Sequence, residues 1–172
     1  IFDNLDKKIV GIGEIGLDYH YTKDNKNKQI EVFERQLDIA EKLNLPVVIH
    51  SRDAAGDTLE ILKRHHNFGV IHSFSGSLEM AKEYIKLGFV LGVNGVVTFK
   101  NCNLGDTLKN IDINSIILET DSPYLTPVPF RGIQNNPGKM INTAKFVADI
   151  YGVSLEELAK ITNQNIKRIF DI

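Results

Sequence analysis

Short apolar runs that end on polar side chains alternate along the chain with stretches of helical spacing. The runs predict strands at residues 9–14, 47–50, 69–72, 89–93 and 115–120. Between the first two strands, apolar residues recur every three or four positions, which is the spacing of one helix face. Similar spacing predicts helices after the second and third strands, and two more helices close the chain. Apolar strands that alternate with helices are typical of an α/β fold with a parallel sheet.

The pattern alone leaves two α/β architectures open. A (β/α)₈ barrel needs eight strand–helix units and typically about 250 residues. The chain has 172 residues and shows five predicted strands, so a five-stranded doubly wound sheet fits its length better.

Four of the five predicted strands end on a side chain that can bind a metal ion. These side chains belong to Glu14, His50, His72 and Asp121. Because the carboxyl ends of parallel strands lie on one face, we expect the four to converge on one site. Two imidazoles and two carboxylates suit Zn²⁺, Mn²⁺ or Fe²⁺, and with water also Mg²⁺. Each residue alone could equally serve a turn or an ion pair, so the prediction depends on their coincidence.

The fifth strand carries a second acid. Glu119 and Asp121 are two positions apart, so they are expected to point to the same face of the strand. Two acids on a buried face are costly unless a positive charge meets them, and a divalent ion would supply it.

Basic side chains on the loops above this site would suit a phosphate group. They are Arg52, Lys100 and Arg131. Arginine binds phosphate in a bidentate way, although a surface arginine or lysine is usually only solvated. Aromatic side chains that could stack on bases are also present: Phe99, Tyr124 and Phe130.

Charge and composition limit the binding partners and the cellular compartment that we expect for the protein. The net charge of −2 gives no overall attraction to nucleic acid or to an anionic membrane, so any contact with DNA has to be local. The single cysteine, Cys102, excludes an internal disulfide and suits a reducing cytosol. The sequence shows neither a run of transmembrane length nor a signal-peptide pattern. We therefore expect a cytoplasmic protein with no membrane partner and no obligate protein partner.

Several motifs support a more specific interpretation. They are Gly13–Tyr19, Val48–Ala54, Ile71–Gly76, Gly95–Asn101, Leu118–Leu125 and Arg131–Gly132. Together, and in this order, they resemble the motifs of TatD-family metal-dependent deoxyribonucleases.

The resemblance implies a TIM-like (β/α)₈ barrel of the amidohydrolase superfamily, of which this chain would supply about the last five β/α units. Residues 1–172 would then form a single domain, a partial barrel that lacks its N-terminal strands. The family's His-x-His pair on its first strand is missing here. A typical barrel of about 250 residues leaves roughly 80 unaccounted for. We expect such a chain to have an open sheet edge and an exposed inner face.

The resemblance also implies hydrolysis of DNA phosphodiester bonds by metal-activated water, chiefly as a 3′→5′ exodeoxyribonuclease on single-stranded DNA or 3′ ends. Up to two divalent ions (Mg²⁺, Mn²⁺ or Zn²⁺) would act in catalysis. Glu14 would bridge the two metal positions, His50 and His72 would hold one, and Asp121 would hold the other. Asp121 would also take the proton from the attacking water.

Two other functions remain open at this stage. The same kind of site could hydrolyse an ester or amide, for instance as a D-aminoacyl-tRNA deacylase. Alternatively, the chain could be an inactive fragment that binds metal weakly or not at all, because the His-x-His pair is absent.

Overall fold

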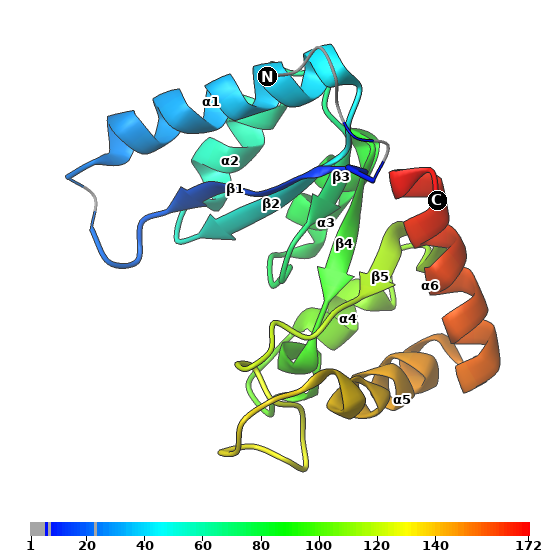
Figure 1. Cartoon of the computed structure of the whole chain (residues 1–172). Coiled ribbons are helices and arrows are strands. Elements are labelled where there is room, and N and C mark those ends of the chain that lie inside the picture. Colours follow the sequence, from blue (N-terminus) through cyan, green and yellow to red (C-terminus); the bar gives the residue numbers. More distant parts are fainter. Residues whose placement is uncertain (1–5, 7, 23) are drawn as a thin grey trace.

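Five parallel strands form one sheet in the computed structural model, which describes residues 6, 8–22 and 24–172 (Figure 1). The strands are β1 (Ile12–Asp18), β2 (Val47–Arg52), β3 (Gly69–Ile71), β4 (Phe89–Val93) and β5 (Ile116–Leu118). The α-helices are α1 (Lys26–Leu43), α2 (Ala55–Leu62), α3 (Leu78–Lys86), α4 (Leu104–Leu108), α5 (Met140–Tyr151) and α6 (Leu155–Phe170). Short 3₁₀ helices cover Gly95–Thr98, Ile113–Ser115 and Pro137–Lys139.

The order of the strands decides between the two architectures. Each strand pairs with the next one in the sequence, so the order is β1-β2-β3-β4-β5. A doubly wound sheet reverses direction at a switch point, whereas a barrel adds each strand on the same side of the last. The α/β fold and the parallel sheet are confirmed, and the strand order is not that of a doubly wound sheet.

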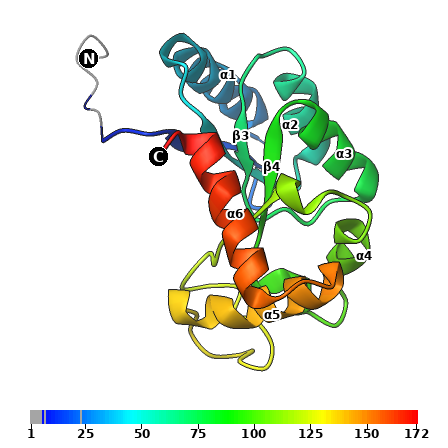
Figure 2. The same cartoon turned by 90° about the vertical axis from the view of Figure 1, so that its right-hand side faces the viewer.

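The main hydrophobic core lies between the sheet and the helices that cover it. Helix α1 packs on β1, α3 on β4 and α6 on β5. Phe33, Leu37 and Ala40 of α1 are buried at the spacing expected for one helix face. Figure 2 shows α6 running beside the sheet and meeting α5 at its lower end. No described helix is long and apolar enough to cross a membrane.

A second, smaller cluster lies on the opposite face of the sheet. Val70, Val90 and Ile117 pack there with Ile169 from the end of α6. Their neighbours along the strands, such as Ile71 and Ile116, point into the main core, because successive side chains alternate between faces. The C-terminal helix α6 therefore partly covers this second face of the sheet. From the sequence we expected instead that the inner face of a partial barrel would be exposed.

The first strand is shifted from its predicted range of 9–14. The ladder begins at Ile12 because its partner β2 begins at Val47, and it continues to Asp18 because β2 continues to Arg52. The sequence pattern predicts that Gly16 lies in the loop after the first strand, but in the structure it belongs to β1. A Cβ atom there would lie 1.9 Å from the carbonyl oxygen of His50, so the close approach of the two strands requires glycine.

From the sequence alone, Asp53 and Ser154 are each expected to cap the helix that follows, but only Ser154 does so. Ser154 caps α6 as expected, since its Oγ accepts a hydrogen bond from the amide of Glu157 at 3.1 Å. Asp53 does not cap α2, which follows Ala54 without a side-chain cap. The Asp53 carboxylate lies instead 3.0 Å from Nδ1 of His20.

Candidate metal centre

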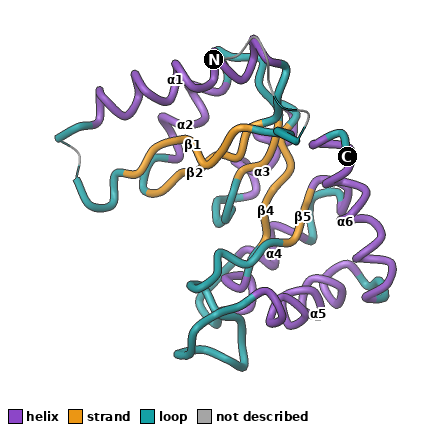
Figure 3. The backbone as a smooth tube through the Cα atoms, viewed as in Figure 1, coloured by secondary structure: helices purple, strands orange, loops and turns teal. Residues whose placement is uncertain are grey.

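The carboxyl ends of the strands bring the four predicted ligands together. His50 lies within β2, His72 directly follows β3, and Asp121 lies three residues after β5. Glu14 occupies a bulge in β1, where the pairing with β2 shifts between Gly13 and Ile15. Bulges of this kind re-aim a side chain next to functional sites. The long loop that follows Asp121 is drawn in teal at the lower left of Figure 3.

The four side chains contact one another in pairs. Oε1 of Glu14 lies 2.8 Å from Nδ1 of His50 and 4.0 Å from Nε2 of His72. Nε2 of His72 also lies 3.5 Å from Oδ1 of Asp121. The structure thus joins residues that are more than a hundred positions apart in the sequence, as the strand ends predicted.

Carboxylates surround the imidazole of His72. Its Nδ1 lies 2.9 Å from Oε2 of Glu119, on the side of the ring away from Glu14 and Asp121. The hydrogen bond to Glu119, together with the negative charges of Glu119, Glu14 and Asp121, outweighs burial and raises the pKa of His72 to about 9. Glu119 and Asp121 lie beyond β5, which ends at Leu118, so the alternation rule that predicted a common face of the strand does not apply to them. Both contact His72, but on opposite sides of its ring.

Asp18 is a member of the site that the sequence did not reveal. Its Oδ2 lies 3.0 Å from Nε2 of His50, while Nδ1 of the same ring faces Glu14. Burial acts to raise the pKa of Asp18, but hydrogen bonds from the His20 amide and from His50 outweigh it, so that this pKa is lowered. Recognising that β1 continues through Gly16 would have placed Asp18 at a strand end.

The chemistry of this donor set fits a divalent cation. Two imidazoles face four carboxylates, an excess of negative charge that a cation would balance. Donors that each lie 2.0–2.2 Å from one ion at tetrahedral or octahedral angles are about 2.8–3.6 Å apart. The observed separations of 2.8, 3.5 and 4.0 Å are close to this range. Among the described residues, however, no three such side chains already converge on a single point.

The three predicted phosphate contacts occupy two separate places. Lys100 and Arg131 line one hollow of about 370 Å³ together with Phe99. The guanidinium of Arg131 lies 3.7 Å from the centre of the Phe99 ring, so that face of the ring is covered. Arg52 contacts Tyr21, which precedes it by 31 positions, with Nη1 3.5 Å from the hydroxyl oxygen.

Fold and site together define a class of protein: α/β proteins whose site is built from side chains at the carboxyl ends of parallel strands. The model for the family "TatD related DNase" matches residues 3–171, and the chain belongs to this TatD family. The family resemblance of the sequence motifs is thereby confirmed.

Relatives and solved structures agree with this assignment. The chain is 44% identical over 170 residues to the uncharacterized metal-dependent hydrolase YabD of Bacillus subtilis, covering 96% of this chain and 67% of YabD. It is 42% identical over 168 residues to the corresponding hydrolase YcfH of Escherichia coli K12, covering 95% of this chain and 63% of YcfH. The crystal structure of YJJV, a TatD homologue from Escherichia coli K12, superposes with a TM-score of 0.89 at 30% identity, over 96% of this chain and 65% of that one. The chain thus spans about two thirds of the length of these proteins.

Proposed function

We propose that the chain acts as a metal-dependent hydrolase that cleaves DNA phosphodiester bonds, as a 3′→5′ exodeoxyribonuclease on single-stranded DNA or 3′ ends. The observation that carries the proposal is the cluster of His50 and His72 with Glu14 and Asp121 at the carboxyl edge of the sheet. The description of the matching family as a DNase and the names of YabD and YcfH as metal-dependent hydrolases support it.

The four ligands have distinct roles in this proposal. Glu14, which lies 2.8 Å from His50 and 4.0 Å from His72, would bridge the two metal positions, and the two imidazoles would hold one of them. Asp121 would hold the other ion and would accept the proton of the attacking water. Bound Mg²⁺, Mn²⁺ or Zn²⁺ would lower the pKa of that water and stabilise charge on the leaving oxygen.

The basic side chains of the loops hold the phosphate backbone in this scheme. Lys100 and Arg131 share a hollow, so they can bind one phosphate group, while Arg52 offers a separate contact. Arg131 already covers one face of the Phe99 ring, so Phe99 is less available to a base. In this scheme a base stacks on Tyr124, which is 70% exposed.

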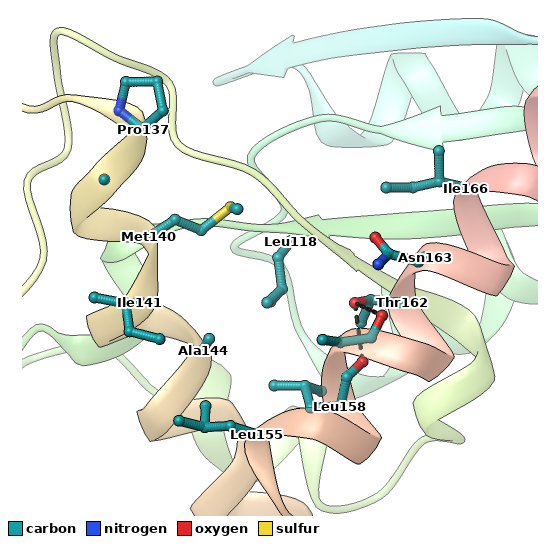
Figure 4. Close-up of a pocket in the computed structure, with 12 residues that line it drawn as sticks. Leu118, Pro137, Met140, Ile141, Ala144, Leu155, Leu158, Thr162, Asn163 and Ile166 are labelled. Carbon is teal, nitrogen blue, oxygen red and sulfur yellow. Dashed lines mark hydrogen bonds between the residues drawn. The ribbon is translucent and has the colours of Figure 1, made fainter.

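The proposal includes a larger fold than the five strands seen here. We infer that they correspond to the last five β/α units of a TIM-like (β/α)₈ barrel, which residues 1–172 represent in part. Sequential strand order and the relatives' greater length support this. A groove of about 410 Å³ beside β5 also suits the packing of a further β/α unit (Figure 4). Apolar side chains of β5, α5 and α6 line it, including Leu118, Met140, Ile141, Leu155 and Ile166.

Digestion of single-stranded DNA tests the function directly. The substrate carries a 3′ label and is incubated with Mg²⁺, Mn²⁺ or a chelator, using this chain and a form extended upstream to the length of the relatives. We expect release of the labelled 3′ nucleotide with either metal and no release with the chelator. If only the extended form cuts DNA, the additional strands supply essential ligands.

Matched histidine variants assign the activity to the proposed site. His50→Gln and His72→Gln should reduce cleavage to background, whereas His66→Gln, at an exposed position in the connection between α2 and β3, should leave it unchanged. If neither form cuts DNA with any metal, the DNA assignment is wrong. Release of a free amino acid from charged tRNA would then support the esterase alternative.

A further inference from the structure

The carboxylate of Glu119 is held in one position from several sides. Its Oε2 lies 2.9 Å from Nδ1 of His72, and its Oε1 accepts a hydrogen bond from the amide of Ser73 at 2.6 Å. The side chain is only 16% exposed. An ionised carboxylate can only accept hydrogen bonds, so Nδ1 of His72 must carry the proton in this pair. Nε2 of the same ring is consequently the nitrogen that faces Glu14 and Asp121.

A missing side chain on the neighbouring strand makes room for this carboxylate. A Cβ atom on Gly92 of β4 would lie 2.5 Å from Oε2 of Glu119 and 2.7 Å from its Cδ. The φ angle of Gly92 is not in the positive range, so its backbone does not require glycine. What requires glycine at this position is the space that Glu119 fills.

A further layer of polar contacts fixes the amide that binds Glu119. Nδ2 of Asn94 donates a hydrogen bond to Oγ of Ser73 at 2.7 Å, and Oδ1 of Asn94 accepts one from the amide of Val96 at 3.1 Å. Asn94 is only 2% exposed. Ser73, which has a φ angle of 48°, is thereby held with its amide directed at Glu119.

We propose that Glu119 is a positioning residue: from a notch opened by Gly92, it orients the His72 ring so that Nε2 faces the metal position, and it does not bind the ion itself. Partners of this kind fix the tautomer and ring direction of ligating histidines. The inference deepens the metal-dependent part of the proposed function and does not depend on DNA as the substrate.

Zinc affinity of the chain, measured by competition with a chelating dye, provides the first test. Glu119→Gln keeps the volume of the side chain and removes its charge, and we expect it to weaken Zn²⁺ binding by about 10- to 100-fold. Gly92→Ala displaces the carboxylate without removing any polar group, and we expect a loss of about tenfold. Gly56→Ala is the matched control, since a Cβ there meets nothing within 4 Å, and it should not change affinity.

A double-mutant cycle separates positioning from a general effect on the fold. Glu119→Ala empties the notch, so Gly92→Ala in that background should change zinc affinity by less than about twofold. If Gly92→Ala costs the same in both backgrounds, or if Glu119→Gln binds Zn²⁺ as tightly as the wild type does, the proposal is wrong. Urea unfolding of each variant shows whether a loss of affinity merely reflects a loss of folded protein.

Proton NMR of the His72 ring gives a readout that does not require zinc. We expect the proton on Nδ1 to be protected from exchange with water in the wild type and to lose this protection in Glu119→Ala. Unchanged protection in that variant would overturn the inference. If the wild type binds no zinc at all, the metal part of the proposed function fails, whereas this signal still decides whether Glu119 orients His72.

Discussion

The two histidines of the site follow the same rule of placement but have different surroundings. The His50 half, made up of Glu14, Asp18 and His50, is open to solvent: the His50 side chain is 34% exposed and that of Glu14 46%. The His72 half, made up of His72 and Glu119, is enclosed, with side chains that are 15% and 16% exposed. The difference matters because a hydrogen bond strengthens, and a missing partner becomes more costly, as water is excluded.

The surroundings of the carboxylate partners account for the contrast. Glu14 and Asp18, the partners of His50, both belong to β1, an edge strand that pairs only with β2. Glu119, the partner of His72, fills the space beside Gly92 of β4 and accepts a hydrogen bond from the Ser73 amide. The carboxyl ends of the strands bring the candidate ligands together, and the packing around each carboxylate partner determines how firmly an imidazole is held.

Removing each imidazole in turn should give the largest effects. His50→Ala and His72→Ala should both weaken Zn²⁺ binding by at least about 100-fold, more than the loss of an outer partner would. Their effects on stability should differ. His72→Ala leaves the nearly buried carboxylate of Glu119 without its imidazole partner, at a cost of about 1–3 kcal/mol. His50→Ala breaks contacts to exposed carboxylates and should cost less than about 1 kcal/mol.

Urea unfolding of the metal-free variants checks the stability difference. His66→Ala, at an exposed position in the connection between α2 and β3, is the matched control and should have little effect. Equal losses for His50→Ala and His72→Ala would show that the two halves are held equally firmly, contrary to what their burial indicates.

The loop that carries Asp121 allows a second test, because one buried side chain ties it together. Nδ2 of Asn135 donates hydrogen bonds to the carbonyl oxygens of Thr120, at 2.9 Å, and Tyr124, at 2.7 Å. Asn135 is only 4% exposed. We expect Asn135→Ala to lower the free energy of unfolding by about 1–3 kcal/mol, because it leaves these carbonyl groups without their partner.

Hydrogen exchange locates the effect of Asn135→Ala. Amides near Asp121 should exchange faster, since the hydrogen bonds that close the loop are lost. Asn110→Ala, which removes an exposed hydrogen bond to the carbonyl oxygen of Asp106, should leave this loop unchanged. Exchange around Asp121 that is equally slow in both variants would mean that Asn135 does not hold the loop.

Much of the His72 half could be predicted from the sequence, because apolar runs that end on polar residues mark the carboxyl ends of strands. His72 was found in this way. The same pattern found Asp121, which is outside this half but lies 3.5 Å from His72. The sequence also drew attention to the carboxylate of Glu119, but it did not reveal its role. That role depends on the notch at Gly92, a close approach between strands that no hydrophobic pattern reports.

The sequence was less informative about the His50 half. Gly16 looked like a loop residue, since glycine weakens strands, and Asp18 was therefore missed. Glycine is required at position 16 because the backbone there lies close to the carbonyl group of His50, and this close contact depends on the register of β1 against β2. Register is a property of two strands together, so one strand read alone could not reveal it.

The smallest expected effect concerns a buried tyrosine that packs against Phe74, two residues after His72 in the sequence. Tyr84 of α3 packs edge-on against Phe74, with ring centroids 6.2 Å apart, and is only 2% exposed. Burial raises the pKa of Tyr84 from 10.0 to about 12. Below pH 10 the ring is neutral in both the folded and the unfolded chain, so its full contribution to stability is present. Between about pH 10 and pH 12 the unfolded chain loses the proton first, and the folded state is destabilised by on the order of 1 kcal/mol at pH 11.

Tyr84→Phe should remove this part of the alkaline loss of stability. The hydroxyl makes only a long hydrogen bond of 3.5 Å to the carbonyl oxygen of Ala55, so the variant should be nearly as stable as the wild type at pH 8. Urea unfolding at pH 8 and pH 11 measures the difference in slope, with Tyr124→Phe, at a side chain that is 70% exposed, as the matched control. If Tyr84→Phe loses as much stability as the wild type does between these pH values, water reaches the Tyr84 ring, and the packing behind the His72 half is looser than its burial indicates.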